Sequence, residues 1–570
     1  MMRLTAKVAA AALLAALPLL VAPAALWGQN NGDGNRQQII SVDSPAYQAL
    51  DSLYLEAGLV EPSAARPYSA DEMAKALERI DRGQLSTAGQ AAYKVVEGAI
   101  NHKTIYKEAG GLQLNVSPTI TVAGYLATDP HAVRDGATNR NWQERTPLIN
   151  IPFQIWLFNN FFADVELPIE TDPFLQNPGI VTSANESNYT NIPFGLAQLD
   201  YMFPVRAFMS TGGSHWNLDF GRDKLDWGNS GFGNLMLSDN SGYYDFLRLT
   251  TYWSSFKFTS LVISLPPYYP GQSYQTVEVA TTGGGSQDQV ITKTMMAHRL
   301  EFRLWNRVNL AVNEALMMAG SVAMANYNPL DIFHNWFIWE QAKSLFSAEV
   351  TVTPLRGLKV YSQFAMDQIQ TGLKDALYNA QSVPNGIAWL LGAKAEYPVA
   401  AGYLTTKAQF TNVGPWIYIA GDPTKAAADI PEPWLSYYMR ERIVSNVTGN
   451  REFLTTPTGW WDGPDSREYD LEFTYRVPAA YSVTLGGSFL QHGTNSITTD
   501  YAIGAAEASM TTPGDSPINT LTVHLGGSLA TFAPITFGVD GYYVYVWNVG
   551  HDPTKSANAL LAEVYVSVGF

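Results

Sequence analysis

Cysteine is absent from the 570 residues of this sequence. Its absence excludes disulfide bonds, thiolate metal sites and a cysteine nucleophile. Charged residues are scarce, at 15% of the chain, against roughly 25% in typical soluble domains. The 35 basic residues are outnumbered by 51 acidic ones, which gives a formal net charge of −16. This balance argues against a nucleic-acid partner, which requires a basic surface.

Long apolar runs are absent beyond the N-terminus. The one run, residues 8–21, follows Arg3 and Lys7 and precedes a stretch rich in alanine. This pattern predicts a secretory signal peptide over 1–28. The run is shorter than the roughly 20 residues of a membrane span, which disfavours the alternative of a membrane anchor. A mature chain embedded in a membrane would therefore have to form a closed β-barrel.

Motifs for catalysis and cofactor binding are also missing. The sequence has no Gly-rich phosphate loop, no HExxH and no G-x-S-x-G, and its eight histidines are scattered. We therefore expect no enzyme activity, no catalytic residue, no metal site and no cofactor.

A small helical domain is predicted near the N-terminus. Residues 29–42 are polar and rich in Gly, Asn and Gln, and we expect them to form a flexible leader. Ser44 precedes a proline, which is typical of a helix start. Ser69 and Glu72 have the spacing of a capping box. Together with the helical spacing of the apolar residues, these signals predict a helical domain over 43–105.

From about residue 112 the apolar period changes to two, which is typical of β-strands with two different faces. About eighteen strands are expected, joined by links that alternate between short and long. Short turns at one end and long loops at the other are typical of outer-membrane barrels. The longest link, 412–467, has room for an extra hairpin. The sequence thus predicts an all-β transmembrane barrel over 112–570, of about eighteen antiparallel strands.

The last strand carries a further signal. Apolar residues alternate with polar or small ones from Ala562 onward, and the chain ends on Phe570. This ending resembles the C-terminal signal by which the barrel-assembly machinery recognises its substrates. We therefore expect this machinery and outer-membrane lipid as partners, in the outer membrane of a diderm bacterium. The helical domain precedes the first strand and is expected on the periplasmic side.

Strand parity predicts which side chains face the lumen. If the apolar residues face lipid, the charged residues of the other parity point inward. These lumen candidates are of mixed sign: they either order a hydrophilic solute or only form ion pairs across the inner wall. They are Arg206, Arg248, Arg299, Glu301, Arg303, Asp367, Lys394, Glu396, Glu472 and Arg476.

The long loops are rich in Trp and Tyr, whose flat faces and polar edges suit stacking on sugar rings. The alternative is that these residues pack the loops or form the aromatic girdle of the barrel. The candidates for polysaccharide contact are Trp227, Trp336, Trp339, Trp460 and Trp461.

Several short segments, in order along the chain, share a resemblance to one family. They are 47–60, 66–69, 221–223, 226–228, 234–238, 298–302, 314, 328–330, 334–335, 357–358, 361, 363–364, 367 and 463–466. They resemble the capsule-assembly Wzi family of outer-membrane proteins. The resemblance implies a helical bundle on an eighteen-stranded barrel that holds or organises capsular polysaccharide. The predicted function is therefore binding or organising surface polysaccharide during capsule assembly or attachment. The alternative is a porin-like channel for small hydrophilic solutes, because the predicted helix pair also resembles modules that precede some porin barrels.

Overall fold

The computed structural model describes residues 35–101, 103–108, 111–129, 145–171, 189–193, 199, 206–266, 277–280, 286–289, 292–319, 327–330, 342–368, 385–419, 435–444, 451–497, 499, 511–532 and 534–570. The predicted signal peptide, Trp336 and Trp339 lie outside these residues.

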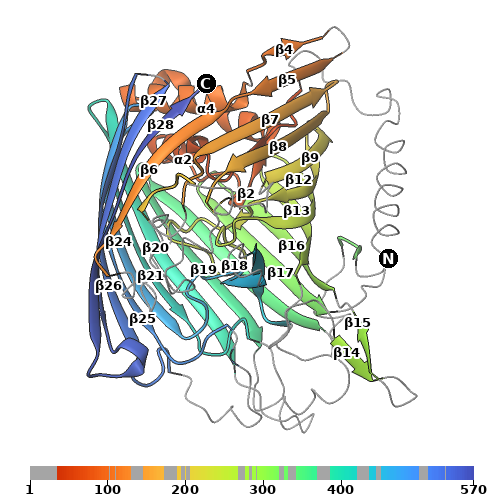
Figure 1. Ribbon diagram of the computed structural model, residues 1–570. Helices are drawn as coiled ribbons and strands as arrows, with labels where there is room; N and C mark the ends of the chain where they lie inside the picture. The colour runs from red at the N-terminus through yellow and green to blue at the C-terminus, as the bar shows by residue number, and fades with distance from the viewer. Residues whose placement is uncertain are drawn as a thin grey trace.

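The main body is a closed barrel of eighteen antiparallel strands (Figure 1). This confirms the predicted fold class and strand number. The wall strands are β6 (Thr119–Ala127), β7 (Ile149–Leu157), β8 (Phe161–Ile169), β9 (Arg206–Gly213), β10 (Trp216–Asp223), β12 (Tyr244–Tyr252), β13 (Phe256–Leu265), β16 (Lys293–Leu304), β17 (Val308–Ala319), β18 (Ala342–Leu355), β19 (Leu358–Gln368), β20 (Gly386–Val399), β21 (Gly402–Val413), β24 (Ser466–Val477), β25 (Tyr481–His492), β26 (Ile518–Phe532), β27 (Ile535–Trp547) and β28 (Ser556–Gly569).

The barrel closes between its last strand and its first. β28 pairs with β6 from Leu561 to Gly569, while β5 (Leu112–Val116) pairs with β7. The segment 112–127 is divided into β5 and β6 around Pro118, because proline has no N–H for the ladder. The backbone N–H of Phe570 donates to the Pro118 carbonyl at 3.0 Å. The chain end therefore lies directly at the closure.

The outer face of the wall is apolar, as the parity of the strands predicts. Tyr469, Leu471 and Phe473 of β24 are 44–46% exposed, whereas the intervening residues face inward. Trp253 and Trp305, at short turns, are also exposed. Such rings at one rim are typical of the aromatic girdle of membrane barrels.

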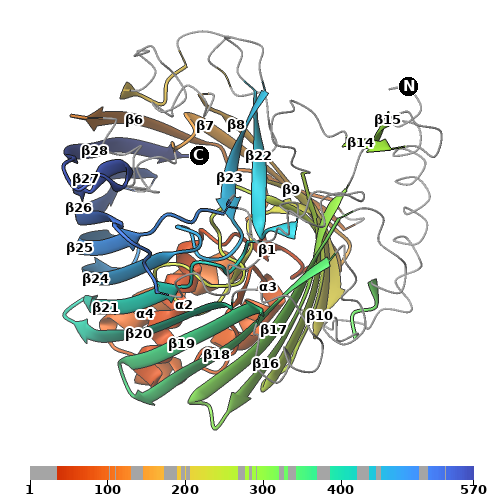
Figure 2. The same cartoon turned by 90° about the horizontal axis from the view of Figure 1, so that it is seen from below.

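The N-terminal domain lies in the barrel mouth at the short-turn end, and its helices lie within the ring of strands (Figure 2). Its helices are α2 (Pro45–Ala57), α3 (Ala70–Leu77) and α4 (Thr87–Ile100), with the short η1 (Arg82–Gln84) between the last two. Side chains of Ser44, Ser69 and Ser86 accept backbone N–H groups at the three helix starts. No helix within the described residues is both long and apolar enough to cross a membrane.

The predicted flexible leader over 29–42 is wrong for residues 35–42. Asn35 and Gln37 are buried, and the Asn35 amide donates to the Leu157 carbonyl. β1 (Ile39–Ile40) pairs with β3 (Tyr68–Ser69). The polar composition suggested a solvated segment, but the barrel mouth supplies partners for these polar groups.

The remaining strands form short pairings in addition to the eighteen wall strands. β14 (Val277–Ala280) and β15 (Ser286–Gln289) form a hairpin, as do β22 (Tyr438–Val444) and β23 (Arg451–Pro457). The second hairpin confirms that link 412–467 holds one. β4 (Tyr106–Lys107) extends the edge beside β5, β2 (Ala65–Arg66) pairs with β11 (Asp226–Trp227), and η7 (Val549–His551) joins β27 to β28.

Candidate functional site

The link 224–243, between β10 and β12, crosses the inside of the barrel, and we call it the inner loop. The backbone N–H of Leu235 donates to Gln363 on β19 at 2.9 Å. The Asn229 amide donates to Thr351 on β18 at 3.0 Å. Near its start, β11 pairs with β2 of the helical domain. The inner loop thus joins the helical domain to the far side of the wall.

The described parts of the link between β21 and β24 also fold inward and cover the inner loop (Figure 2). The Tyr418 N–H donates to the Asp367 carboxylate at 2.8 Å. The Ser238 N–H of the inner loop donates to the Thr458 carbonyl at 2.7 Å. These contacts fill the middle of the barrel with hydrogen-bonded chain.

A hydrophobic core forms where these two segments meet the wall. Trp227 and Trp460 belong to it, and both are fully buried. Neither ring offers a face to a ligand, so their role in this structure is packing. Trp461, the next residue, is only partly buried at the edge of this core.

The predicted lumen residues are enclosed by the barrel. Eight of them are buried: Arg206, Arg248, Arg299, Glu301, Arg303, Lys394, Glu396 and Arg476. The other two, Asp367 and Glu472, are partly buried.

Several of these residues form networks of ion pairs. Arg206 contacts Asp164, Glu166 and Asp223 at 2.8–3.0 Å. Arg299 contacts Glu301 at 3.0 Å and also Glu349. These contacts favour the simpler of the two interpretations, an inner wall held by charge pairs.

Charge pairs also fasten the helical domain to the wall. Lys359 and Lys394 lie directly opposite each other on β19 and β20. Asp51 of α2 accepts from both, at 2.7 and 2.8 Å. Burial alone would raise the pKa of Asp51, but the two lysines outweigh it and hold that pKa well below its usual range.

Two other carboxyls of this domain have a raised pKa. Burial, with a smaller contribution from Asp51, raises the pKa of Glu61 to about 7. Burial also raises the pKa of Glu72, although Lys257 lies 2.5 Å away and opposes the shift. The docked domain therefore contains one carboxyl whose pKa is lowered, Asp51, and two whose pKa values are raised, Glu61 and Glu72.

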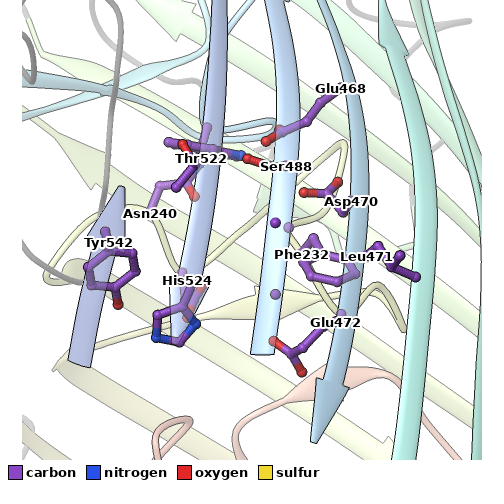
Figure 3. A pocket seen from close by; sticks show the side chains of 16 residues that line it. Phe232, Asn240, Glu468, Asp470, Leu471, Glu472, Ser488, Thr522, His524 and Tyr542 are labelled. Atoms are coloured by element: carbon purple, nitrogen blue, oxygen red, sulfur yellow. The ribbon is translucent and has the colours of Figure 1, made fainter. Parts of the chain in front are cut away.

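A cavity of about 350 Å³ lies between the inner loop and strands β24–β27 (Figure 3), and we call it the acidic cavity. Carboxylates dominate its polar lining, and aromatic rings its apolar lining. Trp461, one of the predicted sugar-contact residues, also lines it. The side chains that argue for a site are Phe232, Glu468, Asp470, Glu472, His524 and Tyr542.

A second cavity, of about 430 Å³, lies between the inner loop and the helical domain. We call it the basic cavity, because Arg66, Lys359, Lys394 and Lys407 line it. Gly231 of the inner loop lines both cavities. Within the described residues, no group of three or more His, Asp or Glu side chains has the arrangement of a metal site.

No protein-family model matches the sequence, and no curated protein matches it. Among solved structures, the chain is similar to Wzi of Escherichia coli, described as an outer-membrane protein involved in group 1 capsule assembly and a carbohydrate-binding β-barrel. The TM-score is 0.54 at 11% identity, over 93% of this chain and 99% of Wzi. This likeness shows that the fold is that of an outer-membrane barrel.

Two further solved structures are more distantly similar. OccD3 of Pseudomonas aeruginosa has a TM-score of 0.38 at 9% identity, over 80% of this chain and 91% of OccD3. DcaP of Acinetobacter baumannii, an outer membrane channel, has a TM-score of 0.32 at 9% identity, over 82% of this chain and 99% of DcaP.

Most residues of the acidic cavity were not among the sequence candidates. Glu472 and Trp461 were, but Phe232, Asp470 and Tyr542 were not. The alternation of carboxylates from Glu468 to Glu472 was a usable signal, because it places three acids on one face of a strand. Nothing in the sequence indicated that Phe232 would fold back to face them.

Proposed function

We propose that this protein binds surface polysaccharide at the outer membrane and helps to organise or attach a capsule-like layer. The filled lumen carries the proposal. A barrel of this size is wide enough for an aqueous channel unless something fills it, and here the helical domain and the inner loop do so. The fold likeness to Wzi, described as carbohydrate-binding, supports the same function. The filling speaks against the alternative, a porin-like channel.

The proposal includes an orientation and a route of assembly. Outer-membrane barrels have short periplasmic turns and long outer loops, so we place the helical domain in the periplasm. The long links then face outward, where they meet polysaccharide. Phe570, at the barrel closure, is the proposed recognition point for the barrel-assembly machinery.

Planar-bilayer recording tests the binding role against the channel role. We expect the wild type to be nearly silent. Gly228→Ala should raise the conductance, because Gly228 has φ +141° and a Cβ there would overlap the side chains of Asn234 and Gln363. Gly98→Ala is the matched control, since a Cβ at Gly98 has nothing within 4 Å. A large, steady conductance of the wild type would favour the channel.

A second test concerns the outer loops. Trp336 and Trp339 lie outside the described residues and remain predicted contact residues. Replacing both with Ala should weaken retention of polysaccharide on cells by up to about tenfold per ring, if each ring contributes about 1.4 kcal/mol. Barrel folding should be unchanged. Equal retention by a folded double variant would assign these residues to loop packing or to the girdle.

A further inference from the structure

The acidic cavity has a line of carboxylates along one strand. β24 alternates its side chains between the two faces of the wall, so Glu468, Asp470 and Glu472 all point inward (Figure 3). Tyr469 and Leu471, between them, point outward and are 46% and 45% exposed. The three carboxylates are thus spaced by about 7 Å along the cavity wall.

Two of these three carboxylates have no cation partner within the described residues. Glu472 is paired with Lys407 at 2.9 Å, but within the described residues neither Glu468 nor Asp470 contacts Lys, Arg or His. Asp470 is only 8% exposed, and its Oδ2 has no hydrogen-bond partner in the described part of the chain. Buried polar atoms are normally hydrogen-bonded. Asp470 Oδ2 lines the cavity and can therefore accept a hydrogen bond from a donor group of a bound ligand.

Aromatic rings form the other part of the lining. Phe232 enters from the inner loop, and Tyr542 stacks on His524 with ring centroids 4.4 Å apart. Trp461 lies at the cavity edge. The volume of about 350 Å³ is at the lower end of the range for small-ligand pockets. Flat rings suit the C–H faces of a sugar, while carboxylates accept hydrogen bonds from its hydroxyl groups.

We propose that the acidic cavity is a binding subsite for a single sugar unit that carries hydroxyl or ammonium donors and no acidic group. The lining has surplus acceptors and no Lys or Arg, and the neighbouring Lys407 is already paired with Glu472, so a uronic or sulfated unit finds no unpaired Lys or Arg there. This proposal rests on the proposed function and specifies part of its ligand. The polysaccharide contains a non-acidic sugar unit that enters the barrel. Trp461 and Asp470 contact that unit.

The test uses the full mature chain in detergent and an array of oligosaccharides with neutral, amino-sugar and uronic members. Wild-type protein should bind one or more neutral or amino-sugar oligosaccharides and no purely uronic one. The Kd of the tightest binder is then compared for three variants. Asp470→Asn should raise that Kd at least about tenfold, because it replaces an acceptor oxygen of the cavity wall with an amide NH₂ donor.

Gly486 provides a matched pair of variants. It lines the cavity, and a Cβ there would meet its nearest neighbours at ordinary distances of 3.5–3.9 Å. Gly486→Leu should fill the cavity and abolish binding, whereas Gly486→Ala should change the Kd less than about threefold. Heat-modifiable migration on a gel checks that each variant is folded.

The outcomes separate this proposal from the proposed function. Binding of uronic oligosaccharides, or an unchanged Kd in folded Asp470→Asn and Gly486→Leu, would overturn the subsite while the polysaccharide-binding function stands. Binding of no oligosaccharide by the wild type would overturn the proposed function itself.

Discussion

Lys407 and Glu472 lie directly opposite each other on β21 and β24, with Nζ and Oε1 2.9 Å apart. Lys407 lines the basic cavity and Glu472 the acidic one. The Cβ of a side chain at Gly231, which borders both cavities, would lie 3.1 Å from Lys407 Cδ. The ion pair and the tip of the inner loop together form the boundary between the two cavities.

Loss of Lys407 should cost more than loss of the Glu472 charge. Lys407→Met leaves Glu472 unpaired beside Asp470, and we expect a loss of roughly 1–3 kcal/mol for this partly exposed pair. Glu472→Gln removes one carboxylate from an acidic wall and should cost less. The double variant should be more stable than the sum of the single losses predicts. The midpoint temperature of heat-modifiable migration measures each effect; equal, additive shifts would contradict the coupling.

Asp51 should control the docking of the helical domain. Asp51→Asn leaves Lys359 and Lys394 facing each other without their shared carboxylate, at a cost of about 3–5 kcal/mol. Hydrogen exchange should then become faster in α2 and remain slow in the strands of the wall. Asp43→Asn is the control, because Asp43 is 59% exposed and pairs with Lys224 at the surface. Equal exchange in both variants would show that Asp51 does not hold the domain.

Glu61 should make the docking weaker as pH rises. Its pKa is raised from 4.5 to about 7 in the folded protein, so folding favours the protonated form. The native state then binds more protons than the unfolded state between pH 4.5 and 7, and stability falls across this window, by about 3 kcal/mol or less. Asp51 acts in the opposite sense, since its lowered pKa removes stability only below about pH 4.

Glu61→Gln should abolish the loss of stability between pH 4.5 and 7. The measurement is the midpoint temperature of the wild type and the variant at pH 5 and pH 8. The variant should gain most at pH 8, where the wild-type carboxylate is charged and buried. An equal gain at both pH values would mean that Glu61 does not titrate in this range.

Phe570 should matter for assembly and not for the folded state. Its ring is 71% exposed, and only its backbone bonds across the closure. Phe570→Ala should therefore reduce the amount of barrel inserted in cells while leaving the midpoint temperature unchanged. Val564→Ala, on the strand that ends just before Phe570 and 57% exposed, should leave insertion unchanged. Normal insertion of Phe570→Ala would remove the proposed recognition by the assembly machinery.

Local patterns in the sequence were sufficient for the wall and the helical domain. Alternation in β24, with Tyr469 and Leu471 outside and Asp470 inside, depends only on the period of a strand. Ser44 and Ser69 cap their helices as expected, because a cap needs only neighbours in the chain. The strand number and the inward parity of residues such as Arg206 follow from the same short-range rules.

Long-range contacts decided the contents of the barrel. Trp227 and Trp460 resembled surface aromatics, but their links fold inward, and no period in the sequence encodes the direction of a loop. The same applies to Phe232, which meets the carboxylates of β24 only because the inner loop crosses the lumen. The sequence by itself determined the barrel, since strand patterning and turn lengths are local. The tertiary structure alone decided that the barrel is filled and that its interior divides into an acidic and a basic cavity, because both depend on contacts between residues far apart in the chain, such as Lys407 with Glu472 and Asp51 with Lys394.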